Sequence, residues 1–460
     1  MRTRKILKRM IYMCGCSILL LNGCGKTASI SESTNSIQET GEVVFGASEM
    51  YETYSVSDFG ILYGKDNRIQ YYDCEADEEY ILCSKLNCSH SDEECSAWYP
   101  SYGMAGIAHY KDKIWYIKEN STKNMWELTS MDVTGEGQQV RASLDIGDAV
   151  GDSWIIQSIH DVYYVDNKAI VSVEYGYVSG EIDSMDNTNK IQYEVIDLTD
   201  GKISIVNEIG CDTKEYNLEG LSKDGLLFEV RENQVKELTE KEFQEAYLAG
   251  EFSKDTISAE DEDELYFEYS SKWYPANCSP VERYLYYDLE TGENTVLEEM
   301  VATLTFDDDG YQIGELPKYI FLGIYDDRFL VSEPEWNGTN KRIFLWDVRS
   351  GEKEEVMIIE NGGVLAFEAG EAESVVDNEG KFLFCKYEAD DKAVIYQYDI
   401  GAKTQKKLFE DKRNITFRII GETQTEYIGK IYTDFGYSIY RISKEDYYSG
   451  EMKQMKKLKL

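Results

Sequence analysis

Positive charge, histidine and proline are all scarce in this sequence. Its 460 residues hold 47 Lys and Arg against 87 Asp and Glu, a formal net charge of -40, together with three His and five Pro. Binding to DNA or RNA phosphates, or to an anionic membrane through a basic face, needs clustered basic residues. The charge argues against both, and we expect no nucleic-acid partner.

Short motifs of common enzymes are absent as well. The sequence contains no Gly-x-Ser-x-Gly, His-Glu-x-x-His, Walker A or dinucleotide-binding Gly-rich segment. His109 and His160 adjoin apolar segments, so we interpret them as packed or hydrogen-bonded residues rather than bases. The carboxylates are too numerous for a glycosidase pair to be singled out. These features argue against many classes of hydrolase.

The N-terminal apolar run is too short to cross a membrane, which takes about 20 residues. Residues 1–9 carry five basic side chains and no acid, and residues 10–21 are mostly apolar. This pattern is typical of a secretory signal. It ends in Leu21-Asn22-Gly23-Cys24, which resembles a bacterial lipobox, although lipoboxes usually have Ala or Ser where Asn22 stands.

The resemblance implies that residues 1–23 are removed as a lipoprotein signal peptide and that Cys24 receives a diacylglyceryl thioether. Acyl chains would then hold the protein on the extracytoplasmic face of the cell membrane. The alternative is an ordinary signal peptide that is cleaved nearby, with Cys24 a plain thiol. Residues 24–44 are rich in Ser, Thr and Glu and predict a flexible tether.

The sequence is rich in tyrosine, with 36 residues, and it contains an internal repeat. Tyrosine suits half-buried β-strands. Each repeat is a strand ending in an aromatic or apolar residue and Asp, then a turn that usually contains Gly, then another strand. Seven copies occur, the last of them degenerate: 72–77, 131–136, 196–202, 287–293, 346–352, 398–403 and 440–445.

This repeat predicts an all-β fold, a β-propeller over residues 45–460, because a ring of small sheets leaves few exposed edges. Seven blades is the favoured count. Six or eight stay open, because the Asp residues of the third and fourth copies are 91 positions apart (288 − 197). Residues 43–45 are an apolar triplet in the segment before the first blade, which we name the leader, and residues 456–460 form a strand-like tail. These features predict that the leader meets the C-terminal blade.

The long gap between the third and fourth copies contains an insertion, residues 235–264. Thr239 and Glu242 have capping-box spacing and precede apolar residues at helical spacing. The acidic run that follows, residues 255–264, is interpreted as a solvated loop. We expect a small helical insertion on one face of the fourth blade.

A cysteine-rich segment follows the first repeat. Cys83, Cys88 and Cys95 form with His90 the pattern Cys-x4-Cys-x-His-x4-Cys, and Cys74 precedes them. Together with the lipobox and the repeats, this pattern resembles that of uncharacterised propeller-like cell-surface lipoproteins of Gram-positive bacteria. The resemblance implies a fold and a location but no activity.

Three Cys and one His are the ligand set of a closed tetrahedral zinc site, so Cys83, Cys88, His90 and Cys95 are candidate ligands of a structural zinc. Cysteines of exported proteins often pair instead, and with Cys74 the segment could form two disulfides. In both alternatives the cross-link restricts the conformation of a long loop. A zinc with four protein ligands has no open position for catalysis.

Two functions of different classes fit these observations. The favoured one is a non-enzymatic, lipid-anchored extracytoplasmic module that binds or scaffolds a glycan, a peptide or a surface protein. The alternative is a carbohydrate-active hydrolase or lyase with carboxylates in the axial funnel of the propeller, because propellers host both classes. An axial funnel filled by apolar side chains would favour the binding module.

The lipobox generates a direct prediction. Cys24→Ala releases the mature protein from membranes, because the lipid is its only expected attachment. Cys14→Ala, which changes a residue of the removed signal, leaves the protein membrane-bound. Cell fractionation measures both, and a Cys24→Ala protein that still needs detergent for release contradicts the lipoprotein interpretation.

Overall fold

The computed structural model describes a defined part of the chain: residues 43–48, 53–100, 103–146, 153–178, 189–207, 209, 214–235, 239–249, 278–301, 305–306, 312–313, 319–334, 340–364, 376, 380–388, 392–411, 417–433 and 436–460. The predicted signal peptide, Cys24 and nearly all of the predicted tether lie outside the described residues. The acidic run 255–264 does so as well.

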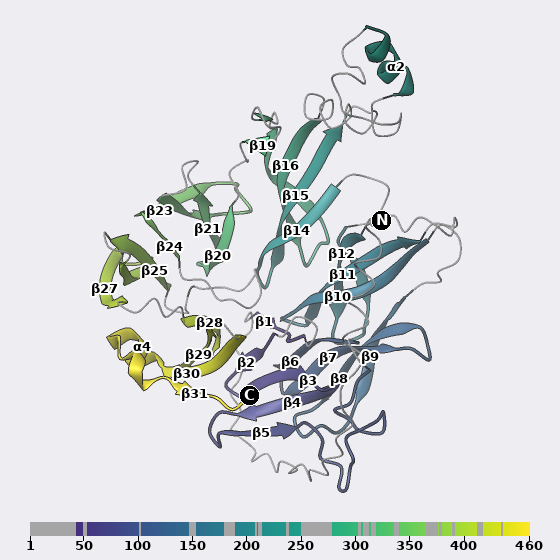
Figure 1. The fold of residues 1–460 in the computed structure, drawn as a ribbon, viewed down its shortest axis with the longest axis vertical. Helices are drawn as coiled ribbons and strands as arrows, with labels where there is room; N and C mark the ends of the chain where they lie inside the picture. The colour runs from purple at the N-terminus through teal and green to yellow at the C-terminus, as the bar shows by residue number, and fades with distance from the viewer. Residues whose placement is uncertain are drawn as a thin grey trace.

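The fold is a seven-bladed β-propeller, as the repeat predicts (Figure 1). Blade 1 comprises β2 (Ser55–Ser57), β3 (Gly60–Lys65), β4 (Arg68–Asp73) and β5 (Glu78–Ile81). Blade 2 comprises β6 (Met104–Tyr110), β7 (Lys113–Asn120), β8 (Met125–Asp132) and β9 (Gln139–Asp145). Blade 3 comprises β10 (Ser153–Val165), β11 (Lys168–Val178), β12 (Asn189–Asp197) and β13 (Ile203–Ile205), with β1 (Val44–Phe45) added to β10.

The second half of the ring repeats this order. Blade 4 comprises β14 (Lys214–Leu221), β15 (Gly225–Val235), β16 (Cys278–Asp288) and β17 (Asn294–Val301). Blade 5 comprises β20 (Ile320–Tyr325), β21 (Arg328–Pro334), β22 (Asn340–Trp346) and β23 (Lys353–Glu360). Blade 6 comprises β24 (Gly362–Val364), β25 (Lys381–Glu388), β26 (Lys392–Asp399) and β27 (Thr404–Asp411). Blade 7 comprises β28 (Phe417–Glu422), β29 (Glu426–Thr433), β30 (Gly436–Ser443) and β31 (Lys456–Lys457).

Each repeat motif is the turn between the third and fourth strands of a blade. Asp197, Asp288 and Asp347 close their turns in the same way: one carboxylate oxygen accepts two backbone N–H groups from residues two and three positions later. A glycine with positive φ completes each of these turns. The degenerate seventh copy differs, because Ser443 caps α4 (Lys444–Ser449), which η1 (Met452–Gln454) follows.

The two ends of the ring differ in the connections that they carry. Neighbouring strands in each blade are antiparallel, so the turns between first and second strands and between third and fourth strands lie on one side. We name this side the turn face. The connections between second and third strands, and those between blades, lie on the opposite side, the loop face.

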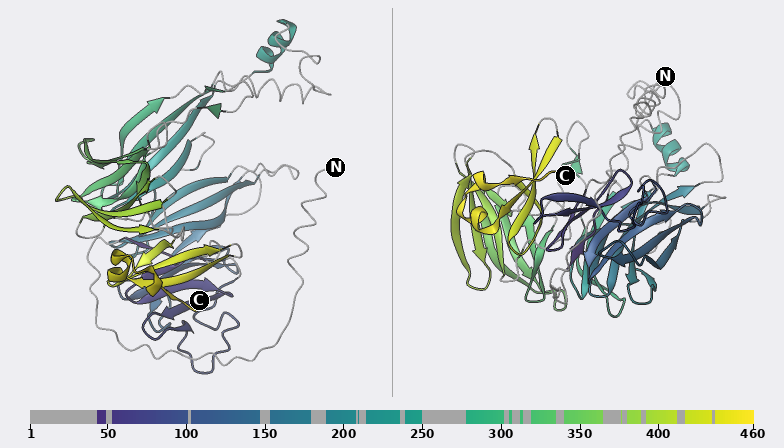
Figure 2. Two further views of the ribbon diagram at one scale, coloured as in Figure 1. Left: turned by 60° about the vertical axis from the view of Figure 1, so that its left-hand side comes forward. Right: turned by 90° about the horizontal axis from the view of Figure 1, so that it is seen from below.

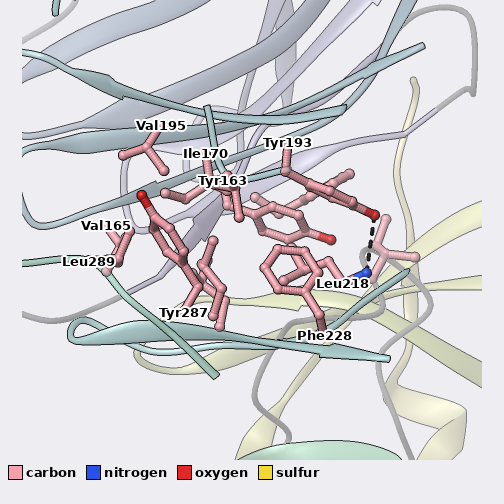
Figure 3. Close-up of a cluster of buried hydrophobic side chains, with 14 of the residues drawn as sticks. Tyr163, Val165, Ile170, Tyr193, Val195, Leu218, Phe228, Tyr287 and Leu289 are labelled. Atoms are coloured by element: carbon pink, nitrogen blue, oxygen red, sulfur yellow. Dashed lines mark hydrogen bonds between the residues drawn. The ribbon is translucent and has the colours of Figure 1, made fainter. Parts of the chain in front are cut away.

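Apolar side chains fill the seven interfaces between blades. Blade 1 illustrates the alternation: Ile61 packs with residues of blade 7, and Leu62 packs with residues of blade 2. Between blades 3 and 4, Tyr193 and Phe228 meet edge to face at 4.9 Å, and the Tyr193 hydroxyl accepts the Leu218 N–H at 3.1 Å (Figure 3). Each sheet is therefore buried on both faces.

Blades 7 and 1 close the ring without exchanging a strand, because all four strands of blade 7 come from the C-terminal end of the chain. The tail strand β31 pairs with β30, and Lys456 of β31 and Lys459 just after it lie 3.4 and 3.3 Å from Asp77 of blade 1. A hydrogen bond from Tyr72, aided by these lysines, lowers the pKa of Asp77 to about 2. The C-terminal tail thus holds blade 7 against blade 1.

The leader strand lies elsewhere than predicted. β1 pairs with β10, with Val44 opposite Tyr164 and Phe45 opposite Tyr163, so it joins blade 3 rather than the C-terminal blade. The first strands of neighbouring blades contact one another around the axis, and the edge of β10 that faces the axis is available for pairing. The leader uses that edge, and the Phe45 ring packs on Tyr163 at 5.4 Å.

The predicted insertion is confirmed in blade 4. The helix α2 (Glu240–Ala249) lies in the connection from β15 to β16, and Thr239 and Glu242 exchange the capping hydrogen bonds that their spacing predicts. It stands away from the sheets on the loop face (Figure 2). A separate hairpin, β18 (Thr305–Phe306) with β19 (Gln312–Ile313), follows blade 4. The 91-residue gap therefore holds a long blade rather than an eighth one.

Glycines on the inner strands let neighbouring blades approach closely. A Cβ on Gly421 of β28 would lie 2.6 Å from the Val56 Cβ of β2, in the interface that closes the ring. A Cβ on Gly220 of β14 would lie 2.5 Å from the Phe321 ring of β20. Both glycines follow a register shift in their strand, where the chain bends towards the next blade.

This close approach yields a stability prediction. Gly421→Ala places a methyl group against Val56 and costs about 1–3 kcal/mol through overpacking at the closing interface. Gly363→Ala in β24 is the matched control, because a Cβ there meets no atom within 4 Å. Thermal melts of both variants measure the difference. Equal melting temperatures for the two contradict closure through this contact.

Candidate metal centre

The candidate metal centre lies in the connection between blades 1 and 2. Residues 82–100 follow β5 on the loop face, and we name residues 82–97 the Cys loop. Its two ends are fixed by backbone hydrogen bonds: Leu82 N–H and Ile69 C=O join at 3.0 Å, and Ile69 N–H and Ala97 C=O at 2.8 Å. The loop therefore begins and ends on the same residue of β4.

All four predicted ligands converge inside this loop. The sulfur atoms of Cys83, Cys88 and Cys95 and a ring nitrogen of His90 lie within 4.8 Å of one another. Nδ1 of His90 lies 3.3 Å from Sγ of Cys95. Cys83, His90 and Cys95 are buried and Cys88 is half-buried. The cluster could hold a metal ion, as the spacing of the four residues predicts.

The backbone of the loop is held in the conformation that this convergence needs. His90 adopts a left-handed backbone conformation, with φ 55°, and its carbonyl accepts the Arg68 Nε–H at 2.6 Å. Tight turns precede two of the cysteines: the Cys88 N–H bonds Lys85 C=O at 3.3 Å, and the Cys95 N–H bonds Asp92 C=O at 3.0 Å. A non-glycine residue in this region costs free energy, so the surrounding contacts must hold it there.

Neighbouring groups shift the pKa values of Cys83 and Cys95 in opposite directions. Burial raises the pKa of Cys83, but the Ser96 hydroxyl, the Lys85 backbone N–H and the other two thiols outweigh this effect and lower that pKa. Burial raises the pKa of Cys95, and the charge on Cys83 raises it further. A bound dication would favour the thiolate form of all three.

The Ser96 hydroxyl was not identified from the sequence. Ser96 is buried, and among the described residues its Oγ has no partner of good hydrogen-bond geometry. Its hydroxyl nevertheless acts on the Cys83 sulfur, whose pKa it lowers. A buried hydroxyl close to a cysteine ligand is the kind of outer contact that supports a metal site. The sequence does place Ser96 directly after Cys95, and this position could have indicated a role near the metal ligands.

Cys74 lies apart from this cluster. It packs on the side of blade 1 that faces blade 7, whereas Cys83 and Cys95 pack on the side that faces blade 2. Its carbonyl accepts a hydrogen bond from Arg441 of blade 7. The loop therefore brings together three cysteines, an odd number that cannot pair completely. All three are free thiols in this structure.

The two remaining histidines have packing partners, as the sequence predicts. The His109 ring stacks on Phe59 of blade 1 with 4.5 Å between centroids, and burial lowers its pKa. His160 Nε2 lies 3.0 Å from Oε2 of Glu174, which also accepts the Ser158 hydroxyl at 2.6 Å. Because the Ser158 hydroxyl donates its hydrogen bond to the carboxylate, these three residues are not arranged as a serine–histidine–carboxylate triad.

The axis of the ring is lined by the leader on one side. The Gly46 N–H bonds Val162 C=O of β10 at 2.8 Å, and Ala47 pairs with Ile107 of β6 through two backbone hydrogen bonds of 2.8 and 2.9 Å. Val44, Phe45 and Ala47 are buried. Apolar leader residues thus cover the inner edges of blades 2 and 3.

Carboxylates also occur on the inner strands. Asp161 of β10 and Glu219 of β14 both lie near Tyr193, whose pKa burial raises to about 12 with a smaller contribution from each carboxylate. Glu219 is buried and Asp161 is half-buried within a bulge of β10. They are two of the inner-strand acids that the enzyme alternative could use; Glu215 of β14 and Glu422 of β28 also lie on inner strands.

No protein-family model and no curated protein matches this chain. Among solved structures it is similar to puromycin hydrolase, at 9% identity and a TM-score of 0.43, over 88% of this chain and 52% of that chain. It is similar to a prolyl endopeptidase at 10% identity and a TM-score of 0.41, over 75% and 41% of the two chains. It is also similar to the β-propeller domain of the Trilobed protease from Pyrococcus furiosus, at 11% and 0.36, over 76% and 78%. The chain spans about half the length of puromycin hydrolase.

The convergence of the four ligands predicts metal retention. Protein purified without chelator carries about one metal ion per chain by elemental analysis, because the set fills one tetrahedron. His90→Ala lowers the metal content, because water replaces a buried ligand. His160→Ala, which removes a histidine far from the loop in sequence, leaves the content unchanged.

The disulfide alternative makes the opposite prediction for the same samples. A loop closed by one disulfide holds no metal, and its intact mass falls by about 2 Da for the bridge. His90→Ala is then silent. Metal-free protein with that mass difference contradicts the metal centre.

Proposed function

We propose that this chain is a lipid-anchored, extracytoplasmic β-propeller that binds or scaffolds a glycan, a peptide or a surface protein and performs no catalysis. The observation that carries the proposal is the buried leader at the axis. Val44, Phe45 and Ala47 place apolar side chains against the inner strands of blades 2 and 3. A site for chemistry in the axial funnel would need polar groups open to substrate at that place.

The positions of Asp161 and Glu219 also favour a binding module over an enzyme. Glu219 is buried, so its carboxylate is not presented to a ligand in the funnel. Asp161 lies in a bulge of the strand that the leader lines. A glycosidase needs two carboxyl groups that both contact the scissile bond. A carbohydrate-active hydrolase or lyase would therefore require the leader to leave the axis before substrate could enter.

We assign zinc to the metal centre of the Cys loop. Three thiolates and one imidazole suit zinc better than calcium or magnesium, which prefer oxygen ligands. Four protein ligands complete its tetrahedron, so the metal would hold the loop between blades 1 and 2 and take no part in chemistry. The role is structural: it stiffens one part of the loop face.

The anchor follows from the lipobox. No helix among the described residues is long and apolar enough to cross a membrane. Removal of residues 1–23 would take away five basic side chains and leave a net charge of (47 − 5) − 87 = −45. Anionic lipids repel a body with this charge, so the attachment would rest on the acyl chains of Cys24.

One experiment distinguishes the proposed binding function from the catalytic alternative. A chain that starts at residue 25 is mixed with purified Gram-positive peptidoglycan, and both the bound protein and the released sugar are measured. We expect the protein to sediment with the polymer, with no new reducing ends and no unsaturated product. Heat-unfolded protein is the control for unspecific sedimentation.

Release of reducing ends or of unsaturated sugars would contradict the binding module and support the enzyme alternative. A loss of that release in Asp161→Asn or in Glu219→Gln would then identify the acids involved. Folded protein that stays in the supernatant would exclude peptidoglycan and direct the search to peptides and surface proteins.

A further inference from the structure

The direction of the leader through the ring can be derived from strand pairing alone. The strand β10 starts at Ser153 on the loop face and ends at Val165, next to the Asp166-Asn167 turn. That turn contacts the corresponding turn of blade 2: the Tyr110 hydroxyl donates to Asp166 C=O at 2.8 Å, and Lys111 Nζ donates to Asn167 Oδ1 at 2.9 Å. The C-terminal end of β10 is therefore on the turn face.

The leader runs against β10. Val44 pairs with Tyr164, one residue from the end of β10, and Phe45 pairs with Tyr163. Gly46 then bonds Val162, and Ala47 reaches Ile107 in the middle of β6. Each later residue of the leader thus lies farther from the turn face. The chain enters the axis at the turn face and advances towards the loop face.

Close packing holds the leader at this place. A Cβ on Gly46 would lie 2.5 Å from the Gly106 Cα of β6, so the leader backbone touches the backbone of blade 2 directly. On its other side, Phe45 packs on Tyr163 of blade 3. The leader is therefore packed between blades 2 and 3. While these contacts persist, the chain cannot enter the axis from the loop face.

We propose that the lipid tether leaves the propeller through the turn face, so that the turn face lies next to the membrane and the loop face is turned outward. This inference rests on the proposed lipid anchor. Nineteen residues (25–43) separate Cys24 from Val44, where β1 begins. A flexible tether of that length has a root-mean-square span of about 24 Å, short enough to favour one face over the other.

The features that distinguish this propeller from a plain ring lie on the outward side. The Cys loop and α2 are both on the loop face, and Leu86 and Leu248 are 86% and 83% exposed there. The turn face carries the short Asp-closed turns of the repeats instead, such as those at Asp197 and Asp288.

Energy transfer to labelled lipids tests this orientation. Glu290 lies in the fourth repeat turn, on the turn face of blade 4, and Leu248 lies on α2 of the same blade; both are exposed. Each is replaced, in a separate full-length variant, by an azide-bearing amino acid that takes a donor dye. The lipidated proteins are placed in vesicles of phosphatidylglycerol and phosphatidylethanolamine that contain an acceptor lipid.

We expect transfer from position 290 to exceed transfer from position 248 by about twofold, because the short tether favours the turn face. Deletion of residues 29–38 shortens the tether from 19 to 9 residues (19 − 10) and increases this ratio. Equal transfer from both positions, or greater transfer from position 248, in protein that floats with the vesicles overturns the orientation. Protein that does not float with the vesicles overturns the lipid anchor and the orientation with it.

Discussion

The burial of both faces of every blade is the constraint on which the rest of this structure depends. Side chains of one strand alternate between neighbours: Ile61 contributes to the interface with blade 7, and Leu62 to the interface with blade 2. One sheet cannot cover two apolar faces, and burial of apolar area contributes about 25 cal/mol per Å². The sheets therefore have to form a closed ring, in which each blade covers one apolar face of each of its two neighbours.

Closure is achieved here without a shared strand. At the junction of blades 7 and 1, Gly421 lets β28 approach Val56, while the tail lysines hold Asp77. The leader takes a different position, against blades 2 and 3, where it fills part of the axis. One end of the chain therefore closes the ring at its rim and the other fills it from within. This arrangement links the proposed anchor to the centre of the fold.

The candidate metal centre was predictable to an unusual extent from spacing alone. Cys83, Cys88, His90 and Cys95 are so close in sequence that one loop can bring them together, and the structure does so. The sequence could not exclude Cys74, because nine residues of chain allow it to reach Cys83. The alternation of strand β4 and its turn directs Cys74 to the other side of blade 1. Ser96 and Arg68 contribute through contacts that only the folded loop defines.

The sequence by itself determined the all-β class, the turn motifs, the insertion in blade 4 and the ligand set, because each depends on residues within one turn, one helix or one loop. Asp197 closes its turn and Thr239 caps its helix through neighbours two or three positions away. The tertiary structure decided the blade count and the place of the leader. Val44 meets Tyr164 across 120 positions (164 − 44), and such a pairing depends on which strand edge is free at the axis once the blades have packed.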